Sequence, residues 1–230
     1  MGQSLFMTLG PSAAWLRLFP GPRIRDVLAY VSNTWGWLQA TYAGAVRFEH
    51  DEPVLTDNLC EALNEANRRA AARMDCDFQA ETRELRRNAN GSTSYVARAD
   101  IRVILGAPGT PHLVLEFKKL NGTTDARRLY CFDGLSRFVE GKYAVGHAHG
   151  VMCGFTSLDL DVETDALAAY ISDKDRARRL ACVADGAGNA VTRPSIVDPV
   201  WARFDTTHRR THDDAIVVLH VLLSCSSAAS

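Results

Sequence analysis

The chain of 230 residues lacks the cysteine patterns that mark metal-binding or disulfide-stabilised proteins. Its six cysteines are scattered, with no C-x-x-C pair and no zinc-finger spacing. It also lacks an apolar run long enough to cross a bilayer, and its first residues show no secretory signal pattern. We therefore expect a reduced, cytoplasmic protein that makes no membrane contact.

The common signatures of nucleotide-binding and hydrolytic enzymes are missing as well. The sequence contains no Walker A, G-x-G-x-x-G, G-x-S-x-G or H-E-x-x-H motif, and no helix-turn-helix or zinc-finger module for reading DNA. Charge of one sign is not in excess either, since 26 Lys and Arg face 27 Asp and Glu. A protein of this balance that binds nucleic acid must gather its basic residues on one face.

The most informative stretch that is present reads as two strands joined by a Gly/Pro turn. The apolar residues Ile101 and Val103 stand on either side of Arg102, an alternation that is typical of a partly buried strand. Residues 107–111, APGTP, form the turn. Residues 113–117 then run apolar, like a central strand, except for the carboxylate of Glu116.

These two strands are expected to bring two carboxylates and an ammonium group together. Asp100 opens the first strand, and Glu116 and Lys118 stand two positions apart on the second, on one face. Mg²⁺ prefers one or two carboxylates, completed by water and substrate phosphate oxygens. A lysine beside the metal can orient a water molecule and offset charge that develops on phosphorus. The pattern therefore predicts a Mg²⁺ site, with Mn²⁺ as a substitute.

The spacing Asp-x15-Glu-x-Lys resembles the PD-(D/E)xK, or restriction-endonuclease-like, nuclease superfamily, mainly over residues 52–157. The match departs from the pattern in one place, because Ala99 stands where the motif has proline. The resemblance implies an α/β fold with a mixed central sheet flanked by helices. It also implies metal-dependent hydrolysis of phosphodiester bonds in DNA, with three catalytic residues: Asp100, Glu116 and Lys118.

The resemblance further implies metal ligands and partners. Asp100, Glu116 and the Phe117 carbonyl would hold the metal, and a helix before the first strand would add an acidic residue. Glu52 fits that role best, while Glu61, Glu81 and Glu84 stay open alternatives. Small nucleases of this kind resemble effectors of bacterial anti-phage defence systems. That likeness implies a protein partner, such as a sensor, helicase or ATPase subunit.

The chain is expected to divide into an N-terminal helical section over 1–50, a nuclease-like domain over 51–225 and a disordered tail over 226–230. The fourth strand should pair parallel to the strand that carries Glu116, because a helical crossover joins them. Helices are expected over residues 23–43, 125–143 and 161–180, and another is expected to begin at about Thr56, with Thr56 or Asp57 as its N-cap. Strands are expected over residues 78–86, 113–117, 150–156 and 215–225, and a further strand is expected to carry Asp100.

Other interpretations of the same residues remain. Asp100 can be a turn residue, and Glu116 with Lys118 an exposed pair, in an inactive module that binds nucleic acid or protein. An unrelated enzyme could use His208, His212 or Asp213. His220 fits a hydrogen-bonded core histidine. DNA or RNA as substrate, and a monomer or a homo-oligomer, stay open.

Overall fold

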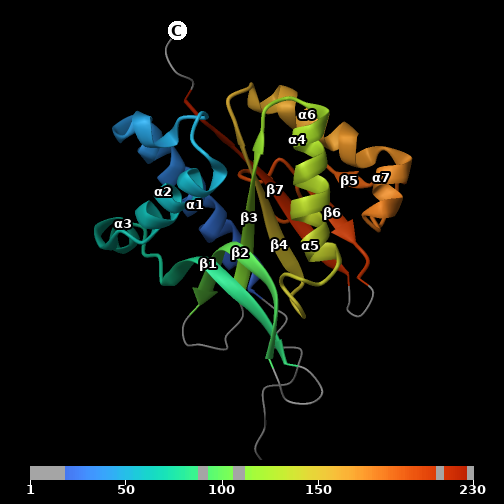
Figure 1. Ribbon diagram of the computed structural model, residues 1–230, viewed down its shortest axis with the longest axis horizontal. Helices are drawn as coiled ribbons and strands as arrows, with labels where there is room; N and C mark the ends of the chain where they lie inside the picture. The colour runs from blue at the N-terminus through green and yellow to red at the C-terminus, as the bar shows by residue number, and fades with distance from the viewer. Residues whose placement is uncertain (1–18, 88–92, 106–111, 211–214, 227–230) are drawn as a thin grey trace, which may run out of the picture.

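A seven-stranded mixed sheet forms the centre of the computed structural model, which describes residues 19–87, 93–105, 112–210 and 215–226 (Figure 1). The strands are β1 (Cys76–Arg87), β2 (Thr93–Leu105), β3 (His112–Leu120), β4 (His149–Thr156), β5 (Val191–Thr192), β6 (Phe204–His208) and β7 (Ile216–Ser224). The α-helices are α1 (Gly21–Thr41), α2 (Glu52–Leu63), α3 (Ala66–Ala71), α4 (Thr124–Leu129), α5 (Ser136–Val139), α6 (Leu160–Ser172) and α7 (Lys174–Arg179). A 3₁₀ turn, η2 (Ala43–Val46), follows α1, and a π-helical turn, η3 (Tyr130–Leu135), joins α4 to α5.

The strands lie in the order β1-β2-β3-β4-β7-β6-β5. The first three form an antiparallel meander, with Ile101 of β2 opposite Leu115 of β3. The α4–α5 connection then returns the chain so that β4 runs parallel to β3, with Met152 opposite Glu116. The parallel pairing expected for residues 150–156 is therefore confirmed. β7 continues the parallel part, and β6 and β5 close the edge in antiparallel fashion.

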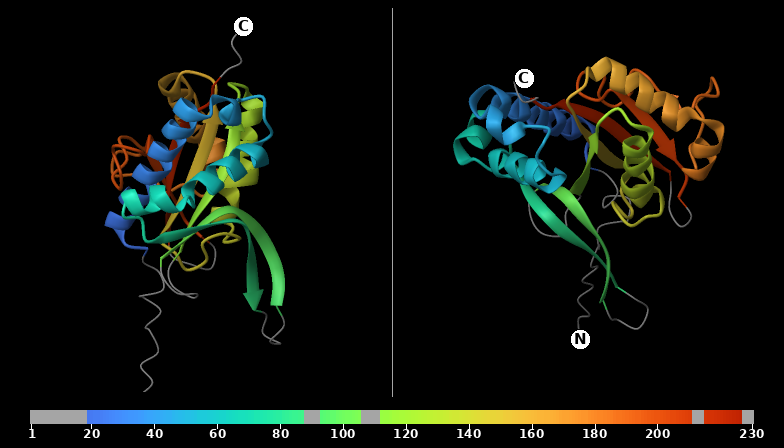
Figure 2. Two further views of the ribbon diagram at one scale, coloured as in Figure 1. Left: turned by 90° about the vertical axis from the view of Figure 1, so that its left-hand side faces the viewer. Right: turned by 45° about the horizontal axis from the view of Figure 1, so that its top comes forward.

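Helices cover both faces of the sheet, as the right-hand view in Figure 2 shows. Alternate positions of each strand point to opposite faces. On one face, Phe117 and Phe155 are buried with α1 and α2, and the Trp35 ring lies 4.8 Å from that of Phe155. On the other face, Met152 is buried with Tyr130 and with residues of α5 and α6. The predicted α/β architecture, with a mixed sheet, flanking helices and an N-terminal helical part, is confirmed at this level.

Several predicted boundaries were wrong. The helix expected from Thr56 begins at Glu52, with Asp51 as its N-cap. Pro53 lies in the first turn, where its fixed φ suits a helix and its missing N–H is no loss. The helix expected over 125–143 ends at Val139 and contains the π-helical turn. The helix expected over 161–180 is divided, because the Asp173 side chain caps the Arg176 N–H and starts α7.

Some predictions concern residues that the structure does not describe. The turns at 88–92 and 107–111, and His212 with Asp213, fall in the gaps of the described ranges. Of the expected tail, Ser226 forms a parallel bridge with Arg47, and 227–230 lie outside the described residues. No helix in the described ranges has the length and apolar character that a bilayer crossing requires.

His220 is the core histidine that the sequence predicts. It is fully buried, its Nδ1 lies 2.9 Å from the Tyr130 hydroxyl, and its Nε2 lies 2.8 Å from Thr206 Oγ1. Burial holds the pKa of His220 well below the usual range, with a smaller contribution from His208. The imidazole is therefore neutral and part of the packing.

The packing of α5 on β4 generates a stability prediction. A Cβ atom added at Gly150 would lie 2.5 and 2.6 Å from ring carbons of the fully buried Phe138. Gly150→Ala should therefore lower the free energy of unfolding by about 1–3 kcal/mol, measured by urea denaturation. Gly36→Ala is the matched control, because its Cβ meets nothing within 4 Å in the interior of α1. That change should stabilise by up to about 1 kcal/mol. Equal effects of the two variants would contradict the packing described.

Candidate functional site

The structure brings together the charged residues that the sequence singles out. Because Ile101 pairs with Leu115 in the antiparallel ladder, Asp100 lies beside the middle of β3. Its Oδ2 accepts a hydrogen bond of 2.7 Å from the Phe117 N–H. Glu116 and Lys118 point to one face of β3, where Lys118 Nζ lies 3.2 Å from Glu116 Oε1. The first turn of α2 adds Glu52, whose Oε1 accepts a hydrogen bond of 2.7 Å from Lys118 Nζ.

Glu52 is the predicted accessory acid that reaches this cluster. Its second oxygen accepts a hydrogen bond of 3.0 Å from the Lys119 N–H, so both carboxylate oxygens hold β3 to the start of α2. Glu61 lies near the other end of the same helix, exposed and lining a separate pocket with Trp37. The side chains of Glu81 and Glu84 lie outside what the structure describes. Glu52 therefore acts on Lys118 and on the backbone of β3.

Glu116 is the group of the site whose ionised form is most disfavoured by its surroundings. Its side chain is 0% exposed, in the middle of a central strand. Oε1 has the cations Lys118 and Arg137 within 3.2 and 3.0 Å, but Oε2 is buried and has no hydrogen-bond partner among the described residues. Burial, with the nearby charge of Asp100, raises the pKa of Glu116 from 4.5 to about 7. An unsatisfied buried carboxylate oxygen requires an explanation, and an absent cation or water is the common one.

The neighbouring ionisable groups respond to the same burial. Burial raises the pKa of Asp100, although Lys118 and the Phe117 N–H act in the opposite direction. Burial would lower the pKa of Lys118, but the carboxylates of Glu116, Glu52 and Asp100 outweigh it and the pKa is raised. Lys118 is therefore an ammonium at neutral pH. It can donate hydrogen bonds and offset negative charge, and it does not serve as a base.

The sequence placed Arg137 among four basic residues of a helix expected beside the site, but it did not single out Arg137 and gave no sign of Tyr143. Arg137 NH1 donates a hydrogen bond of 3.0 Å to Glu116 Oε1 and one of 2.6 Å to the Tyr143 hydroxyl, which donates in turn to the carbonyl of Arg98. Four basic residues occur on the predicted helix after β3, and no periodicity distinguishes Arg137 among them. Arg127, for example, pairs instead with the buried Glu163 at 2.7 Å.

Gly134 explains how the helix approaches the site so closely. A Cβ atom there would lie 2.6 Å from Met152 Cε and 3.4 Å from Lys118 Cγ. The glycine sits in the π-helical turn that precedes α5 and Arg137. A larger residue at this position would therefore force either the Met152 side chain to shift or the helix away from β3 and β4.

The donor set fits a hard divalent cation in its charge and its chemistry. With Glu116 ionised, as a bound cation would require, Glu52, Asp100 and Glu116 carry three negative charges against the two positive charges of Lys118 and Arg137, which leaves a net charge of −1. Mg²⁺ needs only one or two protein carboxylates and takes water and phosphate for the rest. The described residues contain no group of three or more His, Cys, Asp or Glu that could hold a metal ion by themselves.

Of the alternative catalytic candidates His208, His212 and Asp213, only His208 lies in the described residues. His208 is fully buried, with its ring nitrogens 2.8 Å from the Leu180 carbonyl and 2.6 Å from Thr206 Oγ1. Burial lowers the pKa of His208 to about 4, so it is a neutral part of the core. His149 is also shifted downward in pKa by burial.

Comparison with known proteins adds no relative. No protein-family model, no curated protein and no solved structure matches the chain. The chemistry of the site is therefore argued from its own residues.

The raised pKa of Glu116 generates a prediction for the metal-free protein. Because the folded pKa, about 7, lies above 4.5, folding favours the protonated carboxyl, and its contribution to stability is lost as pH rises from about 4.5 to 7. Relative to Glu116→Gln, the wild type should lose about 3 kcal/mol over that range. Urea unfolding of both chains in EDTA measures the difference, in which other titrating groups such as His208 cancel. Parallel stability curves would show that Glu116 is not electrostatically strained.

Proposed function

We propose that the protein is a metal-dependent nuclease that hydrolyses phosphodiester bonds in DNA through a restriction-endonuclease-like core. One observation carries the proposal: the buried Glu116 carboxylate, with its unpartnered Oε2, next to Asp100 and Lys118 on adjacent strands. The order of elements supports it too. A helix, a three-stranded meander, a helical crossover and a parallel strand are what the resemblance to the PD-(D/E)xK superfamily implies.

Each residue has a distinct role in this proposal. Asp100 and Glu116 would hold Mg²⁺, or Mn²⁺ in its place, with the Phe117 carbonyl as a further ligand once it is released by Lys118 Nζ, which donates a hydrogen bond of 2.6 Å to it in this structure. When bound, the ion supplies a water of lowered pKa and stabilises negative charge on the phosphoryl group. Lys118 orients the attacking water with its N–H donors and offsets the developing charge. Glu52 keeps Lys118 in place through the bond of 2.7 Å.

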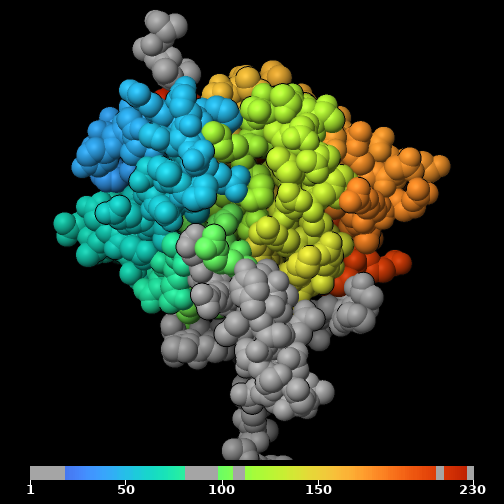
Figure 3. All heavy atoms as spheres, in the orientation of Figure 1, coloured from blue at the N-terminus to red at the C-terminus, as the bar shows by residue number. Residues whose placement is uncertain are grey.

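A substrate can approach the site from the side shown in Figure 3. The surface is hollowed there between the cyan α2 region and the yellow-green α4–α5 region, with the green of the sheet between them. The side chains of Lys118, Glu52 and Arg137 are 14%, 26% and 35% exposed, whereas Glu116 is fully buried. The N–H donors of Lys118 and Arg137, which would meet a phosphate, therefore reach solvent, and the Glu116 carboxylate does not.

The near-neutral charge of the chain supports delivery of DNA by another protein. We propose an effector of a bacterial anti-phage defence system, in which a sensor, helicase or ATPase subunit supplies the substrate. The six free cysteines agree with a reducing cytoplasm, where disulfides are rare.

A second candidate function is an inactive module that binds nucleic acid or protein. The pairing of Glu116 with both Lys118 and Arg137 favours it, because two cations already neutralise part of the carboxylate charge. Stability measurements separate the two functions. A nuclease site should be stabilised by Mg²⁺, by about 2.7 kcal/mol at a concentration one hundred times the dissociation constant. A wild-type melting temperature that does not change in excess Mg²⁺ or Mn²⁺ would favour the inactive binding module.

Cleavage assays test the nuclease directly. Purified protein should nick plasmid and cut single-stranded DNA with Mg²⁺ or Mn²⁺, and EDTA should abolish this activity. Glu116→Gln and Lys118→Ala should each lower the rate at least about a hundredfold, because each removes a group that stabilises the transition state. Glu61→Gln is the matched control, since Glu61 is an exposed acid on the same helix as Glu52. Metal-dependent cleavage that survives Glu116→Gln would refute the mechanism.

A further inference from the structure

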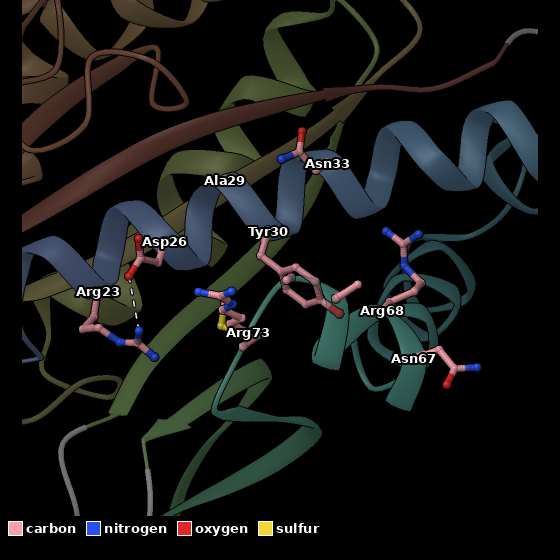
Figure 4. Close-up of a pocket in the computed structure, with 11 residues that line it drawn as sticks. Arg23, Asp26, Ala29, Tyr30, Asn33, Asn67, Arg68 and Arg73 are labelled. Carbon is pink, nitrogen blue, oxygen red and sulfur yellow. Dashed lines mark hydrogen bonds and ion pairs between the residues drawn. The ribbon is translucent and has the colours of Figure 1, made fainter.

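A second concave site lies between α1 and α3, away from the acidic cluster. The cavity has a volume of about 700 Å³ and is lined by residues of both helices and of the turn after α3 (Figure 4). Ligand pockets are commonly about 300–1,000 Å³. Glu52 begins α2 and α3 follows its far end, so a helix of twelve residues, about 18 Å long, separates the two sites.

The pocket carries positive charge that the protein does not neutralise. Three arginines, Arg23, Arg68 and Arg73, line it against one carboxylate, that of Asp26. Arg23 pairs with Asp26 at 3.2 Å and also with Asp75. Over the described ranges, no carboxylate forms an ion pair with Arg68 or Arg73. The net charge of the lining is +2, from three arginines less one aspartate.

Arg68 is held in place by neutral groups. Its NH2 donates a hydrogen bond of 3.2 Å to Thr34 Oγ1, and its guanidinium lies 4.0 Å from the centre of the Trp37 ring. Its Nε is buried without a hydrogen-bond partner in the described structure. The guanidinium is thus oriented in advance, with a buried donor unsatisfied and its charge uncompensated. Such a fork suits the oxygens of a phosphate group.

Arg73 occupies a backbone conformation that favours glycine. Its φ is +51°, in the left-handed region, directly after α3. The Met74 N–H bonds the Arg69 carbonyl across it, which is the usual helix-ending motif with glycine at this position. A side chain there is strained, and such strain persists at functional sites when the side chain has a use. No hydrogen bond or ion pair to a described residue gives the Arg73 guanidinium a structural use.

The rest of the pocket has room and polarity for more than a phosphate. In the view of Figure 4, the Tyr30 ring lies between Arg73 and Arg68, and its hydroxyl donates 3.0 Å to the Leu63 carbonyl, which fixes the ring. The amides of Asn33 and Asn67 supply both donors and acceptors. Three alanines line the remainder and keep the space open: Ala29, Ala71 and Ala72.

We propose that this pocket binds a phosphate-bearing small molecule of nucleotide size, with Arg68 and Arg73 on its phosphate groups. Two uncompensated guanidinium groups call for more than one negative charge, and a phosphate monoester carries about −1.5 to −2 at neutral pH. The volume exceeds what inorganic phosphate alone fills, so a base or sugar occupies the remainder. This binding site is independent of metal binding at Glu116.

The test exploits the opposite effects of Arg73 on stability and on binding. In EDTA, the full chain is titrated with AMP, ADP, a dinucleotide, inorganic phosphate and uncharged adenosine, by calorimetry and thermal denaturation. At least one nucleotide should bind and raise the melting temperature, and adenosine should not. Arg73→Gly should raise the ligand-free melting temperature by about 2–4 °C and weaken nucleotide binding about tenfold.

Two control variants keep the result specific. Ala181→Gly relieves the same backbone strain after α7, where φ is +50°, so it should stabilise without changing nucleotide affinity. Glu116→Gln should also leave that affinity unchanged. The proposal is overturned if no nucleotide binds the wild type, if Arg73→Gly binds as tightly as the wild type, or if Glu116→Gln abolishes binding. If inorganic phosphate binds as tightly as the nucleotides do, the proposal that the ligand has the size of a nucleotide is wrong.

Discussion

The burial of the Glu116 carboxylate within a central strand is the constraint on which the site depends. A carboxylate out of contact with water is costly unless charged and hydrogen-bonding groups surround it. Two cations lie beside it, Lys118 from the same strand β3 and Arg137 from α5, whereas the Asp100 carboxylate from β2 adds a like charge that raises the pKa of Glu116 further. Glu52 then fixes Lys118 from α2. One buried charge thus ties both helical layers to the same part of the sheet.

The two cations beside Glu116 satisfy only one of its two carboxylate oxygens. Lys118 and Arg137 both contact Oε1 of Glu116, and Oε2 has no hydrogen-bond partner in the described structure. The pKa of Glu116 stays raised, because burial and Asp100 outweigh the two cations. A divalent cation would satisfy the oxygen and the charge together.

The sequence revealed the strands and the central residues because their signals are local. An apolar run broken by one carboxylate, two positions before a lysine, is visible without any knowledge of tertiary contacts. The helical crossover that implies a parallel fourth strand is visible in the same way. The Arg137–Tyr143 pair was not visible, because its selection from several basic residues depends on a π-helical turn and on the close approach of Gly134. The start predicted near Thr56 was too late, because Pro53 stands in the first turn of α2 and the helix begins at Glu52, which reaches Lys118. The pocket between α1 and α3 needs the packing of two helices, which residue spacing does not encode.

We propose different tasks for the two sites at opposite ends of α2, cation binding for the buried acidic cluster and binding of a phosphorylated ligand for the open basic pocket. The central claim is that the unsatisfied oxygen of Glu116 belongs to a divalent-cation site. Electron paramagnetic resonance of Mn²⁺ titrated into the protein measures this occupancy without reference to any reaction. The account predicts that wild-type protein depletes the free Mn²⁺ signal and that Glu116→Gln, folded and at the same concentration, does not. Equal depletion by the two chains, or none by the wild type, would contradict it.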